Sequence, residues 1–355
     1  MIQKYLVKIL LAPISLLYGL GIGLRNFFYR TGLLKSLTFN VPVISVGNLS
    51  VGGAGKTPHI EYLIRLLKEH IHLATLSRGY KRKTRGFLEA HIDMTAEQVG
   101  DEPLQFKRKF PDITVAVAEN RAFAIPNLLM AHPNMELILL DDAFQHRSVN
   151  PGKNILLTEF DHPFTDDYLL PSGRLREWRS AYHRADIIIV SKCPPEITET
   201  DKAFFTKKID PLPHQKLFFS YYAYNPPQYI LNPAYSTNLQ TDWDILLVSA
   251  IARTDYLMAH LEPLVNSVHS LEYEDHHLFT AYDLSQIKIK FDAMPGKKKL
   301  ILTTEKDAMR LLLHRNFIIQ NRLPIFAFPV SVRFHFNEGQ SFDDEIKNYL
   351  LEFKV

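Results

Sequence analysis

Residues 45–58 read SVGNLSVGGAGKTP, and this stretch decides how the rest of the chain is interpreted. An apolar, β-rich run at residues 41–48 leads into it, and residues 59–70 follow with apolar side chains on one helical face. A strand, a glycine-rich turn and Gly-Lys-Thr at a helix start form a phosphate-binding loop (P-loop), whose backbone N–H groups hold phosphate oxygens. We therefore predict a nucleotide-phosphate site at eight consecutive residues: Ser50, Val51, Gly52, Gly53, Ala54, Gly55, Lys56 and Thr57.

Two side chains of this loop have individual predicted roles. Lys56 would pair with the β- and γ-phosphates, and the Thr57 hydroxyl would hold Mg²⁺. The pattern departs from the usual one at Ser50, where a glycine is expected. The alternative is a glycine-rich turn that contains Gly-Lys-Thr by chance, and the strand before it and the helix after it argue against that interpretation.

An acidic strand end supplies a second part of a nucleotide site. Residues 137–142 read LILLDD, so Asp141 and Asp142 are predicted metal ligands. Without the P-loop, such a pair would be typical of a turn or a helix cap. Residues 191–194 read SKCP and lack the second carboxylate with which GTPases recognise guanine, which favours ATP over GTP. The predicted cofactors are therefore ATP and Mg²⁺.

Further apolar runs along the chain predict the fold class. Buried strands separated by helix-length segments indicate a parallel sheet covered on both faces. We expect an α/β protein with a P-loop NTPase-like parallel-sheet lobe and a second, smaller α/β lobe. The expected division is an N-terminal helical segment at 1–38, a P-loop domain at 39–230 and a C-terminal lobe at 231–355. The expected strands lie at 72–78, 113–118, 137–142, 154–160, 186–192, 244–250, 298–304 and 325–332.

Composition excludes several classes of protein. A content of 46% hydrophobic and 22% charged residues excludes a disordered or low-complexity chain. The single cysteine, Cys193, excludes an intramolecular disulfide or a multi-cysteine zinc site. Six of the 41 basic residues precede the first acidic residue, Glu61, so the rest of the chain carries 35 basic and 38 acidic side chains. The small positive net charge is thus N-terminal, and a nucleic-acid partner is not expected.

Residues 5–24 form an apolar segment in which Lys8 is the only charge. Its length suits a membrane helix if Lys8 reaches the interface. Pro13 and alternating glycines would weaken a soluble helix but are frequent in membrane helices. A signal peptide is disfavoured because no small-residue cleavage site follows, and a buried core helix is the other alternative. We predict a membrane-associated helix and leave open whether it spans the bilayer or dips into it.

Seven sequence blocks, in this order, resemble the lipid A 4′-kinases (tetraacyldisaccharide 4′-kinases): SVGNLSVGGAGKTP, LSRGYKRKTRG, GDEPLQFKRKFP, AENRAFA, LLDDAFQHR, LLPSGRLRE and LTTEKDAMRL. The resemblance implies ATP-dependent phosphorylation of the 4′-hydroxyl of a tetraacylated glucosamine disaccharide 1-phosphate. It implies a membrane lipid as substrate and a site on the cytoplasmic face of the bacterial inner membrane, with no obligate protein partner. The alternative class is a P-loop switch protein, which needs nucleotide-sensing segments that we do not find in the sequence.

The resemblance also assigns roles to individual residues. It makes Asp101, in Gly100-Asp101-Glu102-Pro103, the acceptor of the substrate proton, although from the residues alone this could be a turn and helix start. It pairs Asp101 with His276 of the second lobe, and the adjacent His277 remains an alternative. It places Arg176 near the transferred phosphate, with Arg174 as the competing choice.

Other polar residues at the expected edge of the sheet are candidate substrate contacts. A guanidinium group suits both the γ-phosphate and the 1-phosphate of the substrate. The basic run at residues 81–85 suggests a contact with anionic lipid. In the second lobe, Ala252 and Arg253 depart from the family pattern. The candidate substrate residues are Ser77, Arg78, Glu102, Arg121, Gln145 and His146.

Overall fold

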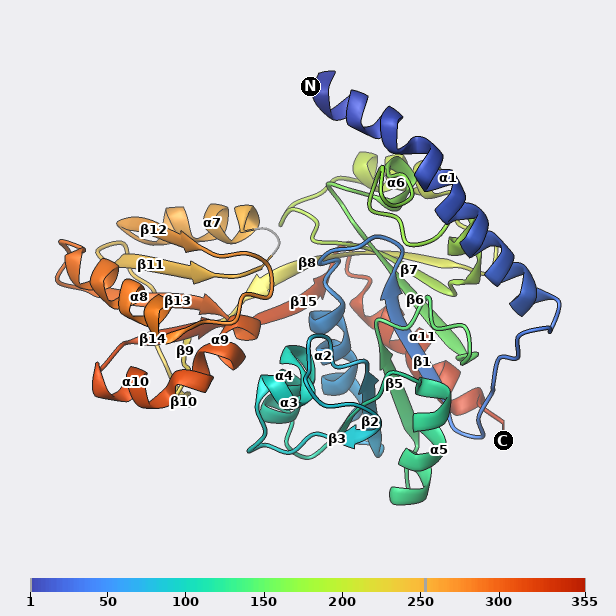
Figure 1. The fold of residues 1–355 in the computed structure, drawn as a ribbon, viewed down its shortest axis with the longest axis horizontal. Coiled ribbons are helices and arrows are strands. Elements are labelled where there is room, and N and C mark those ends of the chain that lie inside the picture. The colour runs from blue at the N-terminus through green and yellow to red at the C-terminus, as the bar shows by residue number, and fades with distance from the viewer. Residues whose placement is uncertain (1, 252–253, 355) are drawn as a thin grey trace.

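The computed structural model describes residues 2–251 and 254–354, which form two α/β lobes side by side (Figure 1). The larger lobe is built on one nine-stranded sheet and the smaller lobe on one six-stranded sheet. The predicted fold class is confirmed. Ala252 and Arg253 lie outside the described residues.

The larger sheet is parallel except at its two edges. Its strands are β1 (Val43–Asn48), β2 (Leu73–Ser77), β3 (Leu88–Glu89), β4 (Thr114–Val117), β5 (Leu137–Asp141), β6 (Lys153–Glu159), β7 (Ile187–Ser191), β8 (Lys216–Tyr224) and β15 (Val330–Phe334). Their order is β15-β8-β7-β6-β1-β5-β2-β4-β3, with β15 and β3 antiparallel to their neighbours. The P-loop strand β1 therefore lies at the centre of the sheet. In open parallel sheets, ligands bind at the carboxyl ends of the strands.

Helices cover both faces of this sheet. One face packs against α2 (Lys56–Leu67), α4 (Asp101–Lys109) and α11 (Gly339–Glu352), through residues such as Ile60, Leu104 and Ile346. The short helix α3 (Ala96–Val99) precedes α4. The other face packs against α5 (Arg121–Ala131) and α6 (Glu199–Ile209), through residues such as Ile125 and Phe205. The apolar side chains of the central strands are thus buried on both sides, as continuous apolar strands require.

The smaller lobe repeats this layered design. Its strands are β9 (Gln228–Tyr229), β10 (Asn232–Ser236), β11 (Asp244–Ser249), β12 (Ser267–Glu272), β13 (Lys299–Thr304) and β14 (Ile325–Phe328), in the order β10-β9-β14-β13-β11-β12. One face carries α8 (Ala281–Ala293), α9 (Glu305–Leu311) and α10 (Arg315–Gln320), and the other carries α7 (Asp255–Leu261).

The division between the lobes differs from the expected one. We expected all of residues 231–355 in the smaller lobe, but β15 pairs with β8 and α11 packs against the larger sheet. The single strand expected at 325–332 is split at Pro329, so that β14 and β15 belong to different sheets. Pro329 lacks the N–H group that a continuous inner strand would need.

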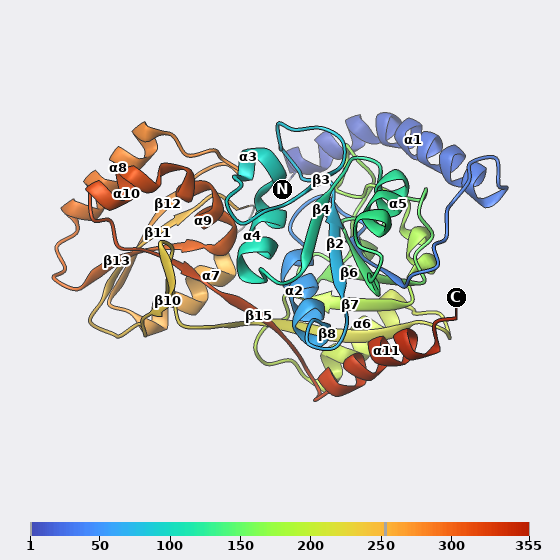
Figure 2. The same ribbon diagram turned by 90° about the horizontal axis from the view of Figure 1, so that it is seen from below.

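The two lobes are connected by an antiparallel pair of strands. The chain enters the smaller lobe after β8 and returns through β15, with Tyr224 paired to Val330 and Ser220 paired to Phe334. Figure 2 shows both strands running from one lobe to the other. The smaller lobe is therefore an insertion between two adjacent strands of the larger sheet.

The N-terminal helix α1 (Ile2–Arg30) lies along the outside of the larger lobe, away from the smaller one (Figures 1 and 2). By length and composition, the part Ile9–Arg30 could cross a membrane. Of its most apolar stretch of 18 residues, 11% is buried against the rest of the protein. Its inner side is held by hydrogen bonds: Tyr18 Oη donates to the carbonyl of Arg176 (3.0 Å), and Trp178 Nε1 donates to the carbonyl of Gly19 (2.8 Å). The helix is thus fixed to the segment that carries Arg176.

Candidate active site

The P-loop connects β1 to α2 and depends on glycine geometry at one position in particular. Gly55 caps the N-terminus of α2 with a φ of 86°, which L side chains rarely adopt. A Cβ at this position would lie 2.5 Å from Tyr222 Oη. The buried His59 imidazole connects the turn to β8, with Nδ1 2.7 Å from the Gly55 carbonyl oxygen and Nε2 3.0 Å from Ser220 Oγ. The close contacts with Tyr222 and His59 therefore restrict the conformation of the loop.

Four polar side chains form a network beside the loop. Lys56 Nζ donates to Asn48 Oδ1 (3.1 Å) and lies 3.6 Å from Asp142 Oδ1. Arg176 binds Asp142 through two nitrogens, at 2.8 and 3.1 Å, and its Nη2 also donates to Asn48 Oδ1 (2.6 Å). These cations hold the pKa of Asp142 well below its usual range, although burial acts in the opposite direction. The arrangement gathers two cations, Lys56 and Arg176, around Asp142 at the start of α2.

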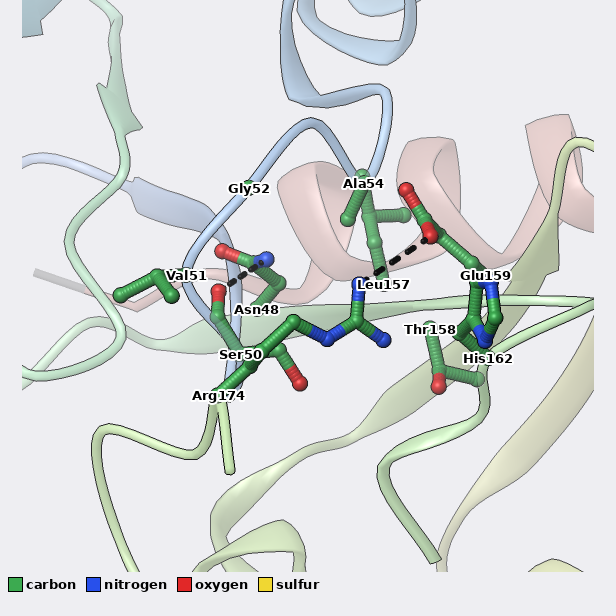
Figure 3. A pocket seen from close by; sticks show the side chains of 10 residues that line it. All are labelled: Asn48, Ser50, Val51, Gly52, Ala54, Leu157, Thr158, Glu159, His162 and Arg174. Carbon is green, nitrogen blue, oxygen red and sulfur yellow. Dashed lines mark hydrogen bonds and ion pairs between the residues drawn. The ribbon is translucent and has the colours of Figure 1, made fainter. Parts of the chain in front are cut away.

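Arg174 and Arg176 point in different directions. The Arg174 Nε donates to Asp167 Oδ2 (3.0 Å), and Nη1 lies 4.0 Å from Glu159 Oε2. Figure 3 shows Arg174 reaching across a pocket beside Ser50 and Gly52. The cavity there has a volume of about 10 Å³, enough for a single water molecule. Of the two arginines, Arg176 is the one that contacts the P-loop network.

Asp141 has the environment expected of a metal ligand. It ends β5, is 6% exposed, and its Oδ1 is buried with no hydrogen-bond partner among the described residues. Burial, together with the nearby Glu102 carboxylate, raises its pKa to about 7. Bound Mg²⁺ would satisfy this oxygen, because hard oxygen ligands suit that ion.

A magnesium ion would rely on few protein ligands here. Across residues 2–251 and 254–354, no group of three or more His, Cys, Asp or Glu side chains forms a metal cluster. Mg²⁺ is commonly held by one or two carboxylates together with nucleotide phosphates and water. Asp141, with the Thr57 hydroxyl at the start of α2, fits that pattern, whereas the Asp142 carboxylate is already bound by Arg176.

The structure brings Asp101 and His276 together across the two lobes. Asp101 begins α4 and is 6% exposed, and its Oδ2 lies 3.3 Å from His276 Nδ1. The fully buried Arg310 also approaches this carboxylate, with Nε 3.6 Å from the same oxygen. His277 instead pairs with Asp283 (2.9 Å) in its own lobe. Of the two adjacent histidines, His276 is therefore the one that faces Asp101.

Glu102 is bound by a lysine that the sequence analysis did not select. Lys306 Nζ lies 2.8 Å from Glu102 Oε1. Burial would raise the pKa of Glu102, but the Lys306 ammonium outweighs that effect and leaves it below its ordinary value. Glu102 therefore lies at the boundary between the two lobes and forms an ion pair with Lys306 of the smaller lobe.

The remaining candidates differ in burial and in their contacts. Arg121 is 4% exposed, and burial lowers its pKa to about 10. Its backbone N–H donates to His146 Nε2 (3.2 Å), and burial and nearby arginines lower the pKa of His146 to about 4. Arg78 is exposed, whereas Ser77 is buried and its Oγ accepts from the Gly79 N–H (3.3 Å). Gln145 Nε2 donates to the Asn48 carbonyl (2.9 Å), which links that side chain to the P-loop strand.

The basic run after Tyr80 has one buried side chain, Arg82, whereas Lys81, Lys83 and Arg85 are exposed. The Arg82 side chain is 2% exposed and binds Glu119 (2.6 Å), and Lys83 binds Glu97 (2.6 Å). Lys81 Nζ donates to the His276 carbonyl (3.4 Å). The suggested lipid contact is therefore wrong for Arg82, because its side chain is buried in an ion pair with Glu119, and it stays a prediction for the exposed Lys81, Lys83 and Arg85.

The sequence analysis did not select three residues that belong to the site: Asn48, Lys306 and Arg310. Asn48 is the last residue of β1 and belongs to the first block of the family resemblance, and Lys306 and Arg310 belong to its last block, LTTEKDAMRL. Their place in these blocks could therefore have marked them as candidates. Their individual contacts could not be predicted for Lys306 and Arg310, because the partners Glu102 and Asp101 are far away in the chain.

Comparison with known proteins gives a consistent result. A family model described as Tetraacyldisaccharide-1-P 4′-kinase (LpxK) matches residues 7–351. The tetraacyldisaccharide 4′-kinase of Bacteroides thetaiotaomicron is 44% identical over 353 residues, covering 96% of this chain and 93% of the relative. That of Flavobacterium psychrophilum is 45% identical over 342 residues, covering 96% of each chain. A crystal structure of LpxK from Aquifex aeolicus in complex with ATP has a TM-score of 0.72 and 27% identity, covering 97% of this chain and 99% of the other.

Proposed function

This chain belongs to the tetraacyldisaccharide-1-P 4′-kinase family, and we propose that it transfers the γ-phosphoryl group of ATP to the 4′-hydroxyl of a tetraacylated disaccharide 1-phosphate. The observation that carries this proposal is the pair of contacts at the carboxyl edge of the larger sheet: Lys56 and Arg176 gather at Asp142, and Asp101 is held by His276. The Asp141 carboxylate is close enough to both Lys56 and Glu102, which follows Asp101, for their charges to act on it. A phosphate donor and an alcohol acceptor can meet there.

In the proposed reaction, the acceptor oxygen attacks the γ-phosphorus in line with the bridging oxygen to the β-phosphate. The new O–P bond forms as the bond to that bridging oxygen breaks, and ADP leaves. The proton of the 4′-hydroxyl moves to the Asp101 carboxylate. His276 holds this carboxylate in place through Nδ1, at 3.3 Å. Phosphoryl transfer is accelerated mainly by such positioning and by electrostatic stabilisation.

The P-loop residues and Arg176 supply the electrostatic part. The N–H groups of Ser50 to Thr57 would cradle the phosphates, with Lys56 and Arg176 on the transferred group. The complex of the Aquifex aeolicus relative with ATP supports ATP as the phosphate donor. Thr57 and Asp141 would hold Mg²⁺, which when bound neutralises phosphate charge, whereas Asp142 would act through its ion pair with Arg176.

We further propose that the protein works at a membrane surface, on the cytoplasmic face of the bacterial inner membrane. The outward side of α1 exposes a row of large apolar residues, which supports burial in lipid. Hydrogen bonds on its inner side support a helix lying in the interface. The exposed residues are Ile9, Leu10, Ile14, Leu16, Leu17, Leu20, Leu24 and Phe27.

The test is to incubate the purified full-length protein with γ-labelled ATP, Mg²⁺ and a tetraacylated disaccharide 1-phosphate in detergent. We expect label to appear in the lipid, and the same lipid with its 4′-hydroxyl blocked to remain unlabelled. ATP hydrolysis without labelled lipid would contradict the kinase assignment and favour a nucleotide-driven switch.

A further inference from the structure

The sequence block LTTEKDAMRL, at residues 302–311, has no role in the proposed chemistry so far. Its helix α9 forms three ionic contacts with the larger lobe. Glu305 binds Lys109, Lys306 binds Glu102 at 2.8 Å, and Arg310 lies 3.6 Å from Asp101. α9 and α4 thus pack against each other at the candidate base.

Lys306 has a second partner in addition to Glu102. Its Nζ lies 3.0 Å from Nε2 of His276, whose other ring nitrogen, Nδ1, lies 3.3 Å from Asp101 Oδ2. A lysine ammonium can only donate hydrogen bonds, so Nε2 must accept. In the neutral ring the hydrogen then resides on Nδ1 and points to the carboxylate. We propose that Lys306 is a positioning residue that selects the Nδ1–H tautomer of His276 and so orients the imidazole toward Asp101.

The opposite tautomer is disfavoured at both ends of the ring. An Nε2–H group would face the Lys306 ammonium, donor against donor. At the same time, the Nδ1 lone pair would face the Asp101 carboxylate, acceptor against acceptor. The contacts with Asp101 and Lys306 therefore select the same ring state.

Other contacts keep Lys306 charged and the ring in place. Burial would lower the pKa of Lys306, but Glu102, Asp101 and Asp275 outweigh burial and leave its pKa above the ordinary value. The His276 backbone has a φ of 60°, and its N–H donates to the Ala250 carbonyl (3.1 Å). The Tyr80 ring contacts the imidazole edge-on, with centroids 4.8 Å apart. Lys306 thus acts on an imidazole that is already restrained.

The kinetic part of this inference rests on the proposed function, whereas the tautomer can be measured independently of turnover. The experiment is NMR of the full-length protein with ¹⁵N-labelled histidine, in which His276→Gln assigns the His276 signals. We expect the wild-type ring to be the Nδ1–H tautomer, and Lys306→Met to shift it toward Nε2–H. Lys306→Arg keeps a donor and is expected to retain Nδ1–H. Unchanged His276 signals in Lys306→Met would overturn the proposal.

Kinetics separate positioning from lobe docking. Loss of a residue that orients a catalytic group typically lowers activity by about 10–100-fold. We expect a fall of this size in kcat for Lys306→Met with little change in KM for ATP, and partial recovery in Lys306→Arg. Glu305→Gln is the matched control, because it breaks an ion pair between the same two helices without touching His276. An equal loss in Glu305→Gln would show that Lys306 acts only by docking the lobes, and would refute positioning.

Failure of this proposal and failure of the kinase assignment give different results. A protein without lipid kinase activity can still show the Nδ1–H tautomer and its dependence on Lys306. Conversely, a fully active kinase whose His276 tautomer ignores Lys306 would refute only the positioning role.

Discussion

Asp101 and His276 belong to different lobes, yet Asp101 Oδ2 and His276 Nδ1 lie 3.3 Å apart. The two residues are 175 positions apart in the chain. α4 supplies the carboxylate, and the loop after β12 supplies the imidazole. The contact exists only when the two lobes are docked, so lobe closure would assemble the proposed base.

Asp101→Asn tests the proposed proton acceptor. The amide keeps the size of the side chain but cannot take up the proton of the 4′-hydroxyl. We expect kcat to fall by about 10²–10⁴-fold, the usual contribution of general base catalysis. ATP affinity, measured by equilibrium binding, should stay near the wild-type value because the P-loop is unchanged. A kcat close to wild type would remove Asp101 from this role.

Gly55→Ala tests the geometry of the P-loop. The new Cβ would lie 2.5 Å from Tyr222 Oη, at a backbone φ of 86°. Backbone strain of this kind costs about 1–3 kcal/mol, and the steric clash adds to it. We expect ATP affinity, measured by calorimetry, to fall at least 10-fold. The double variant Gly55→Ala with Tyr222→Phe removes the hydroxyl that the new Cβ would meet, so it should recover only the part of the ATP affinity that is lost to this clash. Normal ATP binding by Gly55→Ala alone would contradict the requirement for glycine.

The buried His59 predicts a pH dependence of stability. Burial lowers its pKa from 6.5 to about 4 in the folded protein. The unfolded state therefore binds more protons between these values, so stability falls as the pH decreases through this window. From pH 7 to pH 5, wild type should lose about 2 kcal/mol more than His59→Gln. Urea unfolding of both proteins at the two pH values measures this, and equal losses would show that His59 does not contribute.

The exposed side of α1 predicts membrane binding that can be separated from nucleotide binding. Leu17 and Leu20 are 69% and 58% exposed. Each buried leucine contributes about 1.5–3 kcal/mol, so Leu17→Asp with Leu20→Asp should weaken binding to lipid vesicles by more than about 100-fold. Leu351→Asp is the control, since Leu351 is 84% exposed on α11. ATP binding in detergent should stay unchanged, and unaltered vesicle binding of the double variant would contradict the membrane role of this face.

The parts of the fold and site predicted from sequence were those encoded by neighbouring residues. The strand, glycine turn and helix around Lys56 form a local pattern, and Asp141 directly follows the apolar residues of its own strand. Buried parallel strands are recognisable because both faces of each strand are apolar.

What could not be predicted depends on contacts between distant residues. The pairing of β15 with β8 is decided by packing across the whole larger lobe, and Pro329 gives only a local sign of the break. Lys306 reaches His276 and Glu102 from another part of the chain, and local sequence does not show such contacts. His276 and His277 are adjacent and chemically identical, so only the backbone at His276, with a φ of 60°, decides which one faces Asp101.

The insertion of the smaller lobe also sets an order of events during synthesis. β15 and α11 complete the larger lobe: Phe342 and Ile346 fill its core, and Tyr62 donates to Asp343 (2.8 Å). These residues leave the ribosome only after the whole smaller lobe has been made. Since domains generally fold as units during translation, the smaller lobe is complete before the larger one. Until α11 has been made, the P-loop helix α2 lacks the contacts with Phe342 and Asp343, so the support of the nucleotide site depends on residues made after the whole smaller lobe.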